Sequence, residues 1–449
     1  MPRQSAVDLA ERIRIQAERS GAQEAETYLE SGTTTEARLR QGQVELFQQS
    51  SILGLGLRVF RDRRMGFLYT TDLRETVLNE LVNRTLALTN MATPRDENKI
   101  TETLAVTQSD LELRDEAVVR LRPEDLIRFA RTAEESAFAQ DKRIQTTKDV
   151  RCGTAVAEVY FSNTYIARQT YRGTTVWLSA TPVATQGSQR REGSFIDRKR
   201  FLADLARPEQ IGQRAVERAL AKLGGTPVPS ARVPVVFSAE AAGVFLQGLF
   251  AAFSALNVLE QRSFLTGKLG QSIASPAVTI VDDGTMRRGL GSRYFDGEGG
   301  ETNRTVAVDR GVLRQYLHSA ATARRMNVPP TGNGLRSYDT LPAIGPTNFY
   351  IDYGSTGTDR LRREVDRGLY VTGLAGFGVD TVSGEYSQQV EGQWIEKGEL
   401  TKPVEGVTVA GRLDEMLLGI DGVGTDLEFR SNVASPTIRF KELTVAGGA

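Results

Sequence analysis

The segment from residue 239 to about residue 256 constrains the fold more than any other part of the chain, because apolar side chains surround the helix that it predicts. A helix at the surface of a protein has an apolar stripe and an opposite polar face. Here Phe245, Leu249 and Phe253 recur at helical spacing and lie on one face of the predicted helix. Val244 lies on another face and is also apolar. Such a helix has to be buried, so the chain around it must supply a shell of other elements.

That shell is predicted to consist mainly of strands. After the apolar helix the chain is rich in glycine and in short strand-like runs, with two further helices predicted at 313–326 and 413–418. A short strand at 233–237 precedes the apolar helix. We therefore expect a β-rich domain, a barrel or a sandwich, wrapped around the buried helix.

The first half of the chain mixes helical and period-two patterns, which is typical of an α+β fold. Alternating apolar residues between 25 and 70 predict a strand meander, and more strands are predicted between 148 and 184. Helices are predicted at 5–21, 72–92, 123–140 and 208–223.

One proline-rich segment predicts a domain boundary. The segment 226–234, TPVPSARVP, contains three prolines and has no helical period. We expect an N-terminal α+β domain over 1–115, a central α+β segment over 116–228 packed with it, and a β-rich C-terminal domain over 229–449.

Composition argues against several classes of function. Lys plus Arg and Asp plus Glu both total 56, so the formal net charge is zero and we expect no nucleic-acid partner. The chain has no run of about 18 apolar residues, so we expect no membrane span. The N-terminal residues lack an apolar run of signal-peptide length, and a single cysteine agrees with a reducing compartment. We therefore expect a cytoplasmic protein.

The chain has one histidine, His318, and one cysteine, Cys152. Zinc enzymes usually take three protein ligands from His, Cys and carboxylates, and most use at least two histidines. This count argues against a self-contained zinc site, and a nucleophilic triad would depend on His318 alone. We expect His318 to be structural and Cys152 to be a small buried apolar group.

Carboxylates gather in the glycine-rich segment 289–305, GLGSRYFDGEGGETNRT. Its spacing fits no phosphate-binding glycine motif, and tight turns between strands are the better interpretation. Asp296, Glu298 and Glu301 could bind a cation or a substrate amine, although we expect a solvated loop. Trp394 could line a peptide groove together with these carboxylates, or it could pack in a core, which is the commoner fate of such a residue.

Several separated segments resemble one known family. DGEGGETNRT, TGNG, VSGEYSQQVEGQWIEKGEL and IDGVGTDLEFRS follow one another as in the TldD/PmbA family, and LRQGQVELFQQS to GLGLRVF is similar to the family's opening region. The resemblance spans nearly the whole chain. It implies an α+β N-terminal region and a β-rich C-terminal domain. It also implies that the chain takes part in the cleavage of peptides.

The resemblance also implies where a metal would bind. TldD-type chains carry H-E-x-x-x-H on the apolar helix, with the Glu as general base, and a cysteine ligand near the C-terminus. Here the corresponding positions are Ala239, Glu240 and Val244, and the region near Ser431 has no cysteine. The PmbA branch, also called TldE, lacks these ligands, so the resemblance places this chain in that branch, with no catalytic residue and no metal ligand of its own.

A chain of this branch is expected to act with a partner. The resemblance implies a heterodimer with a TldD-type catalytic subunit that contains the zinc and acts on unfolded or extended peptides. One alternative is a stand-alone peptide-binding or regulatory homodimer, which matches the family's description as a modulator of DNA gyrase. Another is an enzyme that uses the carboxylates around Asp296 without zinc.

Overall fold

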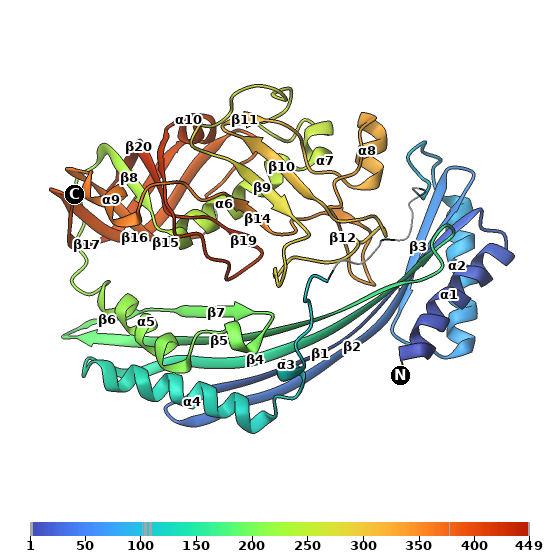
Figure 1. Cartoon of the computed structure of the whole chain (residues 1–449), viewed down its shortest axis with the longest axis horizontal. Coiled ribbons are helices and arrows are strands. Elements are labelled where there is room, and N and C mark those ends of the chain that lie inside the picture. Colours follow the sequence, from blue (N-terminus) through green and yellow to red (C-terminus); the bar gives the residue numbers. More distant parts are fainter. Residues whose placement is uncertain (1–2, 101, 103–105, 107–109, 377, 448–449) are drawn as a thin grey trace.

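A computed structural model of the chain describes residues 3–100, 102, 106, 110–376 and 378–447. Its elements form a long curved sheet with helices on it, and a β-rich domain that lies over the concave face of that sheet (Figure 1). The expected α+β class is confirmed.

The curved sheet has seven strands in the order β3-β2-β1-β4-β5-β6, with β7 also paired to β5. Its long strands are antiparallel, and β1 pairs with both β2 and β4 along most of its length. The bounds are β1 Glu24–Arg40, β2 Gln43–Arg61, β3 Arg64–Thr70, β4 Ile144–Asn163, β5 Gln169–Gln186, β6 Gln189–Glu192 and β7 Phe195–Lys199.

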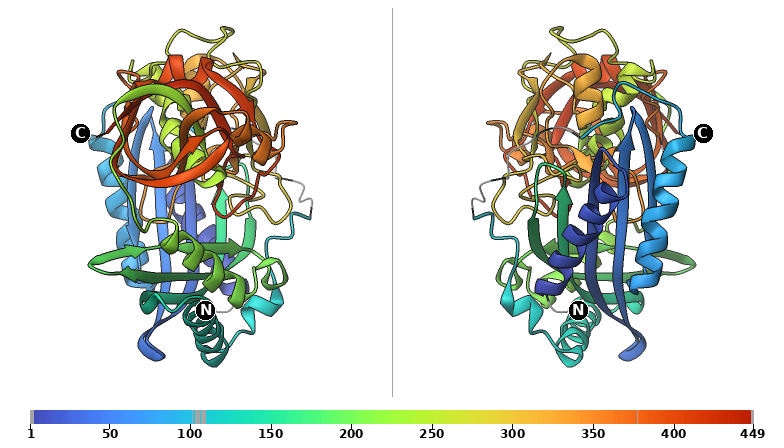
Figure 2. Two further views of the ribbon diagram at one scale, coloured as in Figure 1. Left: turned by 90° about the vertical axis from the view of Figure 1, so that its left-hand side faces the viewer. Right: turned by 90° about the vertical axis from the view of Figure 1, so that its right-hand side faces the viewer.

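Two pairs of helices pack on this sheet. Figures 1 and 2 show α1 (Arg3–Arg19) and α2 (Glu75–Met91) on the face turned away from the C-terminal domain. Farther along the sheet, α4 (Pro123–Gln140) and α5 (Pro208–Leu220) pack against each other and share an apolar core with β4 and β5. The short helices are α3 Glu116–Val119 and the 3-10 turn Leu202–Asp204.

The segments expected as an N-terminal domain and a central segment therefore contribute strands to one sheet. Strands β1 to β3 come from the first segment, and β4 to β7 come from the second. The three-part division of the chain stays a prediction.

The C-terminal region contains a closed barrel. Strands β17, β16, β15, β8 and β20 are neighbours in that order, and β17 also pairs with β20, so no edge is left in this ring of five. Strand β18 (Ile420–Val423) pairs with β20 outside the ring. The bounds are β8 Ala231–Phe237, β15 Arg367–Ala375, β16 Glu385–Glu396, β17 Glu399–Arg412 and β20 Ile438–Ala446.

A second, five-stranded sheet lies beside the barrel in the order β11-β10-β9-β14-β19. Its bounds are β11 Val312–Leu313, β10 Arg304–Asp309, β9 Ile280–Asp283, β14 Phe349–Ile351 and β19 Val433–Ala434, and a small ladder joins β12 Gly334–Leu335 to β13 Ala343–Ile344. The remaining helices are α7 Ala255–Leu259, α8 Ala320–Met326, α9 Thr358–Arg363 and α10 Leu413–Leu418.

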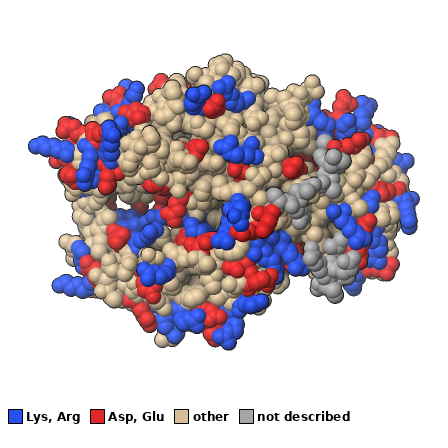
Figure 3. Space-filling model, in the orientation of Figure 1, with Lys and Arg blue, Asp and Glu red and all other residues tan. Residues whose placement is uncertain are grey.

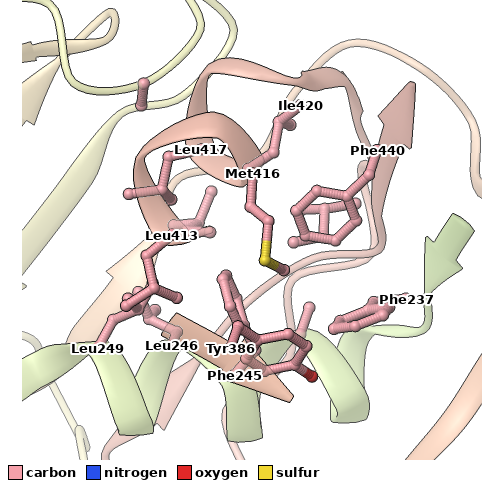
Figure 4. Close-up of a cluster of buried hydrophobic side chains, with 14 of the residues drawn as sticks. Phe237, Phe245, Leu246, Leu249, Tyr386, Leu413, Met416, Leu417, Ile420 and Phe440 are labelled. Atoms are coloured by element: carbon pink, nitrogen blue, oxygen red, sulfur yellow. The ribbon is translucent and has the colours of Figure 1, made fainter. Parts of the chain in front are cut away.

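The apolar helix α6 (Ala239–Phe253) packs against strands of both sheets of this domain. The ring of Phe245 meets those of Tyr386 and Phe440 edge-on, with centroids 5.5 and 5.9 Å apart (Figure 4). The predicted burial is thus confirmed for one side of the helix. It is wrong for Glu240 and Val244, which are exposed because they line a cleft.

The helix predicted at 313–326 is shorter than expected. Leu313 belongs to strand β11, and Leu317 forms an isolated bridge with Ser254, so the helix begins only at Ala320. Ser319 caps it, and His318 lies just before this cap. Tertiary strand pairing thus overrides the helical pattern here. The predicted helix at 413–418 is confirmed as α10.

A buried ion network fixes the C-terminal domain to the concave face of the curved sheet. Arg336 pairs with Glu26 of β1, and Arg58 Nε of β2 lies 2.9 Å from Glu26 Oε1. At Gly56 a Cβ would lie 2.2 Å from the Tyr338 carbonyl oxygen, so only glycine allows this approach.

None of the helices in the described part of the chain combines the length and apolar character needed to span a membrane.

Candidate functional site

The stripe of α6 that is exposed faces a cleft of about 550 Å³. Helix α5 and the β6–β7 turn form one wall, and the start of α6 and the strands β15 and β16 form the other. The hollow is visible in Figure 3 at the left, between the C-terminal domain above and the curved sheet below, with charges of both signs at its rim. The cleft therefore lies between the two halves of the molecule.

An arginine from each half converges on Glu240 inside this cleft. Arg218 of α5 pairs with both carboxylate oxygens, with 3.0 Å between Nη1 and Oε1. Arg430, from the segment between β18 and β19, has its Nη1 3.9 Å from Glu240 Oε2. Arg218 Nη1 also donates to the Ser194 carbonyl oxygen at 2.7 Å. The Glu240 carboxylate is therefore held between two guanidinium cations.

A buried phenyl ring positions these guanidinium groups. The guanidinium carbons of Arg218 and Arg430 lie 4.8 and 4.7 Å from the centroid of Phe195, and that of Arg214 lies 5.1 Å from it. Phe195 is 2% exposed and belongs to the core between α4, α5 and the curved sheet. Cation–π attraction at a partly desolvated ring restricts the arginines to this place.

The positions that the family resemblance singles out lie together here. Ala239, Glu240 and Val244 all line the cleft. Ser431 follows Arg430, but its hydroxyl is occupied locally, since it donates to the Val433 carbonyl oxygen at 2.7 Å.

The residues present do not fit a zinc ion. Methyl groups at Ala239 and Val244 offer no donor atom, and the only carboxylate between them is already paired with two arginines. Within the described ranges, no group of three or more His, Cys, Asp or Glu side chains is arranged to hold a metal ion.

The lone histidine and the lone cysteine lie outside the cleft. His318 is 3% exposed, and burial lowers its pKa to about 4, so it is neutral at pH 7. Its nearest side-chain partner is Thr322 Oγ1, 3.4 Å from Nδ1. Cys152 is buried as expected, and burial raises the pKa of its thiol to about 12. A thiol with that pKa stays protonated and is a poor nucleophile.

The acidic loop lies elsewhere, where the C-terminal domain meets the concave face of the curved sheet. Asp296 is 3% exposed and accepts hydrogen bonds from the backbone N–H groups of Glu298, Gly300 and Gly334. Burial, and next the neighbouring Glu298 carboxylate, raise the pKa of Asp296 to about 7. Glu298 accepts from the Ala320 N–H at 2.7 Å.

The expectation of a solvated loop is therefore wrong for Asp296, which is buried, and for Glu298, whose Oε1 lies 3.7 Å from Arg58 Nη2 of β2. It is right for Glu301, which is exposed. Trp394 is 3% exposed in the core of the C-terminal domain. None of these four residues lines the cleft at α6. A peptide-binding role for them stays a prediction.

Arg218, Arg430 and Phe195 were not predicted from the sequence. Each is one residue of a common type in a segment without a motif, and Arg218 is one of several arginines on or near α5. Only the packing of α5 against the barrel domain shows that they meet.

The chain thus combines a closed barrel domain, a long curved sheet and a cleft between them. Sequence profiles assign this scaffold to a class of metallopeptidases: the PmbA/TldA metallopeptidase C-terminal domain matches residues 230–447, domain 1 matches 25–88, and the central domain matches 119–223. The chain belongs to the PmbA/TldD family of metallopeptidases, and it is a member of the PmbA/TldE type.

Individual relatives cover nearly the whole chain. The metalloprotease PmbA of Escherichia coli O157:H7 is 30% identical over 425 residues, which are 94% of this chain and 92% of that protein. A metalloprotease TldD homolog of Haemophilus influenzae is 28% identical over 428 residues, 88% of this chain and 86% of the relative.

Solved structures share the fold. A putative modulator of DNA gyrase from Bacteroides thetaiotaomicron superposes with a TM-score of 0.91 at 27% identity and covers 100% of both chains. TldE from Thermococcus kodakarensis has the same fold, with a TM-score of 0.89 at 21% identity and coverage of 98% of this chain and 100% of that one.

Proposed function

We propose that this chain is the non-catalytic, TldE/PmbA-type subunit of a heterodimeric zinc metallopeptidase. A TldD-type partner holds the zinc and carries out hydrolysis, and the complex acts on unfolded or extended peptides. This chain contributes a wall of the peptide cleft. Its relatives are named metalloproteases, and in this proposal that activity belongs to the complex.

The placement of Glu240 between Arg218 and Arg430 supports this proposal most strongly. A divalent cation at this point would have to replace two guanidinium cations on a single carboxylate, with no imidazole or thiolate to add. Without a metal-bound water, Glu240 also has no nucleophile to activate as a general base. The carboxylate instead links α5 to α6.

The decisive experiment measures metal and activity subunit by subunit. This chain is purified alone, a TldD-type chain is purified alone, and the two are co-purified. We expect about one zinc per TldD-type chain, none in this chain, and chelator-sensitive cleavage of unstructured peptides by the complex. Chelator-sensitive cleavage by this chain alone would disprove the proposal.

One observation favours a stand-alone peptide-binding or regulatory protein instead. Residues of both halves of this chain line a cleft of about 550 Å³ at α6, which is a volume in the range of ligand-binding clefts. This alternative would be supported if the chain formed a homodimer that binds extended peptides without cleaving them and does not bind a TldD-type chain. Contact with DNA has no support in the zero net charge.

A further inference from the structure

The outer edge of β2 is unpaired along half of the strand. Strand β3 pairs only with the part from Leu55 to Arg61. The part from Gln43 to Gly54 pairs with β1 on one side, and among the described residues no strand pairs with its other side. Figure 2 shows this β1–β2 hairpin, in blue, beside α4.

This free part of β2 is also uncovered on its two faces. Val44 and Phe47 are each 41% exposed, and Ile52 is 49% exposed. All residues from Gln43 to Ile52 are exposed except Leu46, which is half-buried. A strand that must stay single usually carries lysines, prolines or inward-pointing charges along its edge. The segment QVELFQQSSIL has one charge, Glu45, and no proline. The edge therefore lacks the usual protection against pairing.

The register identifies the backbone groups that point outward. Arg61 faces Arg64 across the two-residue turn to β3, so its N–H and C=O point to the β3 side. The Phe60 carbonyl oxygen accepts from the Gln23 N–H, on the β1 side. Because these directions alternate along a strand, Gln49 and Ser51 present their N–H and C=O groups to the free edge. The single register shift opposite Glu45 lies beyond this stretch.

We propose that this free edge of β2 is the dimer interface, and that it pairs antiparallel with the equivalent strand of a TldD-type chain. The inference rests on the proposed function, since that function supplies the partner. The TldD homolog of Haemophilus influenzae aligns with 88% of this chain, so a partner of that type carries the same sheet. When equivalent edge strands of two similar chains pair about a two-fold axis in one continuous sheet, the two strands run antiparallel.

The pairing has a geometric consequence. A two-fold axis that relates two antiparallel edge strands within one continuous sheet is perpendicular to that sheet. The concave faces of the two subunits then point in the same direction, so both C-terminal domains lie on one side of the joined sheet (Figure 1). Val44, Phe47 and Ile52, exposed in the single chain, become covered at the junction.

Two substitutions at one position test the interface. Gln49→Pro removes an outward N–H and leaves the β1 ladder intact, and Gln49→Lys adds an edge charge without backbone constraint. Met91→Lys on α2, an 85% exposed apolar position away from the edge, is the matched control. The affinity of each purified variant for a TldD-type chain is measured by titration, and the mass of each mixture by light scattering.

We expect the unsubstituted chain and the Met91→Lys variant to form the same heterodimer with a TldD-type chain. Each Gln49 substitution should raise the Kd of this heterodimer by about tenfold or more. Equal affinity of all four proteins would overturn the interface and leave the proposed function standing. No association of the unsubstituted chain would overturn the proposed function itself. A homodimer of this chain that the Gln49 variants abolish, or a loss of peptide binding without a loss of heterodimer, would overturn the TldD-type occupant.

Discussion

Arg218 on α5 and Glu240 on α6 form a two-pronged ion pair across the cleft, with 3.0 Å between Nη1 and Oε1. The pair joins a helix of the curved sheet to the first turn of the apolar helix. It occupies the place at which the family resemblance puts a metal-binding turn in TldD-type chains. By that resemblance, an ion pair between the two halves of this chain lies where a TldD-type chain is expected to carry its general base.

Replacing Glu240 by Gln tests whether the carboxylate has a catalytic role. Its side chain is 44% exposed, and exposed ion pairs contribute about 1 kcal/mol or less, so we expect a small decrease in the free energy of unfolding. Peptidase activity of the complex with a TldD-type chain should stay within about twofold. Glu391→Gln, which breaks the pair with Lys222 in the same cleft, is the control. A loss of activity by a factor of 100 or more, typical of a missing general base, would contradict the prediction.

Restoring imidazoles should not by itself restore a zinc site. The double variant Ala239→His, Val244→His supplies two ligands, but the cations of Arg218 and Arg430 remain beside them. We expect weak zinc binding, improved at least about tenfold when Arg430→Ala is added, because removing a nearby positive charge favours a divalent cation. Calorimetric titration with zinc measures both variants. Equal affinity in the two would show that Arg430 does not oppose the metal.

Phe195 is predicted to be the main structural anchor of the cleft. Truncation of a buried phenyl ring costs about 3–5 kcal/mol, and Phe195→Ala should decrease the free energy of unfolding by that amount. Phe195→Leu keeps most of the volume and loses the cation–π contacts, so its cost should be clearly smaller. Denaturant unfolding of both variants gives the comparison. Similar costs for Ala and Leu would mean that the ring matters for its π face more than for its volume.

His318 predicts how stability depends on pH. Its pKa is lowered to about 4 in the folded chain, below the ordinary value of 6.5, so between these values the unfolded chain binds the extra proton. The contribution of His318 to stability is complete above about pH 6.5 and is lost as the pH falls toward 4, at up to about 1.4 kcal/mol per pH unit. Because the chain has a single histidine, its NMR titration is unambiguous. His318→Gln should flatten the slope of unfolding free energy in this range, and an unchanged slope would assign it to the carboxylates.

Much of the fold follows from local patterns. The period of Phe245, Leu249 and Phe253 predicted a buried helix, and the glycine-rich strands after it predicted the β-rich domain that surrounds it. The same patterns failed where a long-range contact decides the local structure. Leu317 lies in a stretch of helical character, yet its bridge to Ser254 keeps it out of the helix. Asp296 lies in a segment with loop composition, yet it is buried and accepts a hydrogen bond from the N–H of Gly334, 38 residues away.

The sequence by itself determined that the chain has one histidine and one cysteine, and that alanine and valine stand at the two positions where the family resemblance expects zinc-binding histidines. It also determined the apolar helix, because periodicity along a chain is a local property. Only the tertiary structure decided which charged side chains meet at the start of the apolar helix. Arg218, Glu240 and Arg430 come from three distant segments, and the sequence does not show which charges will meet, since that depends on how α5 packs against the barrel domain. The free edge of β2 was decided in the same way, because β3 ends before it reaches Gly54.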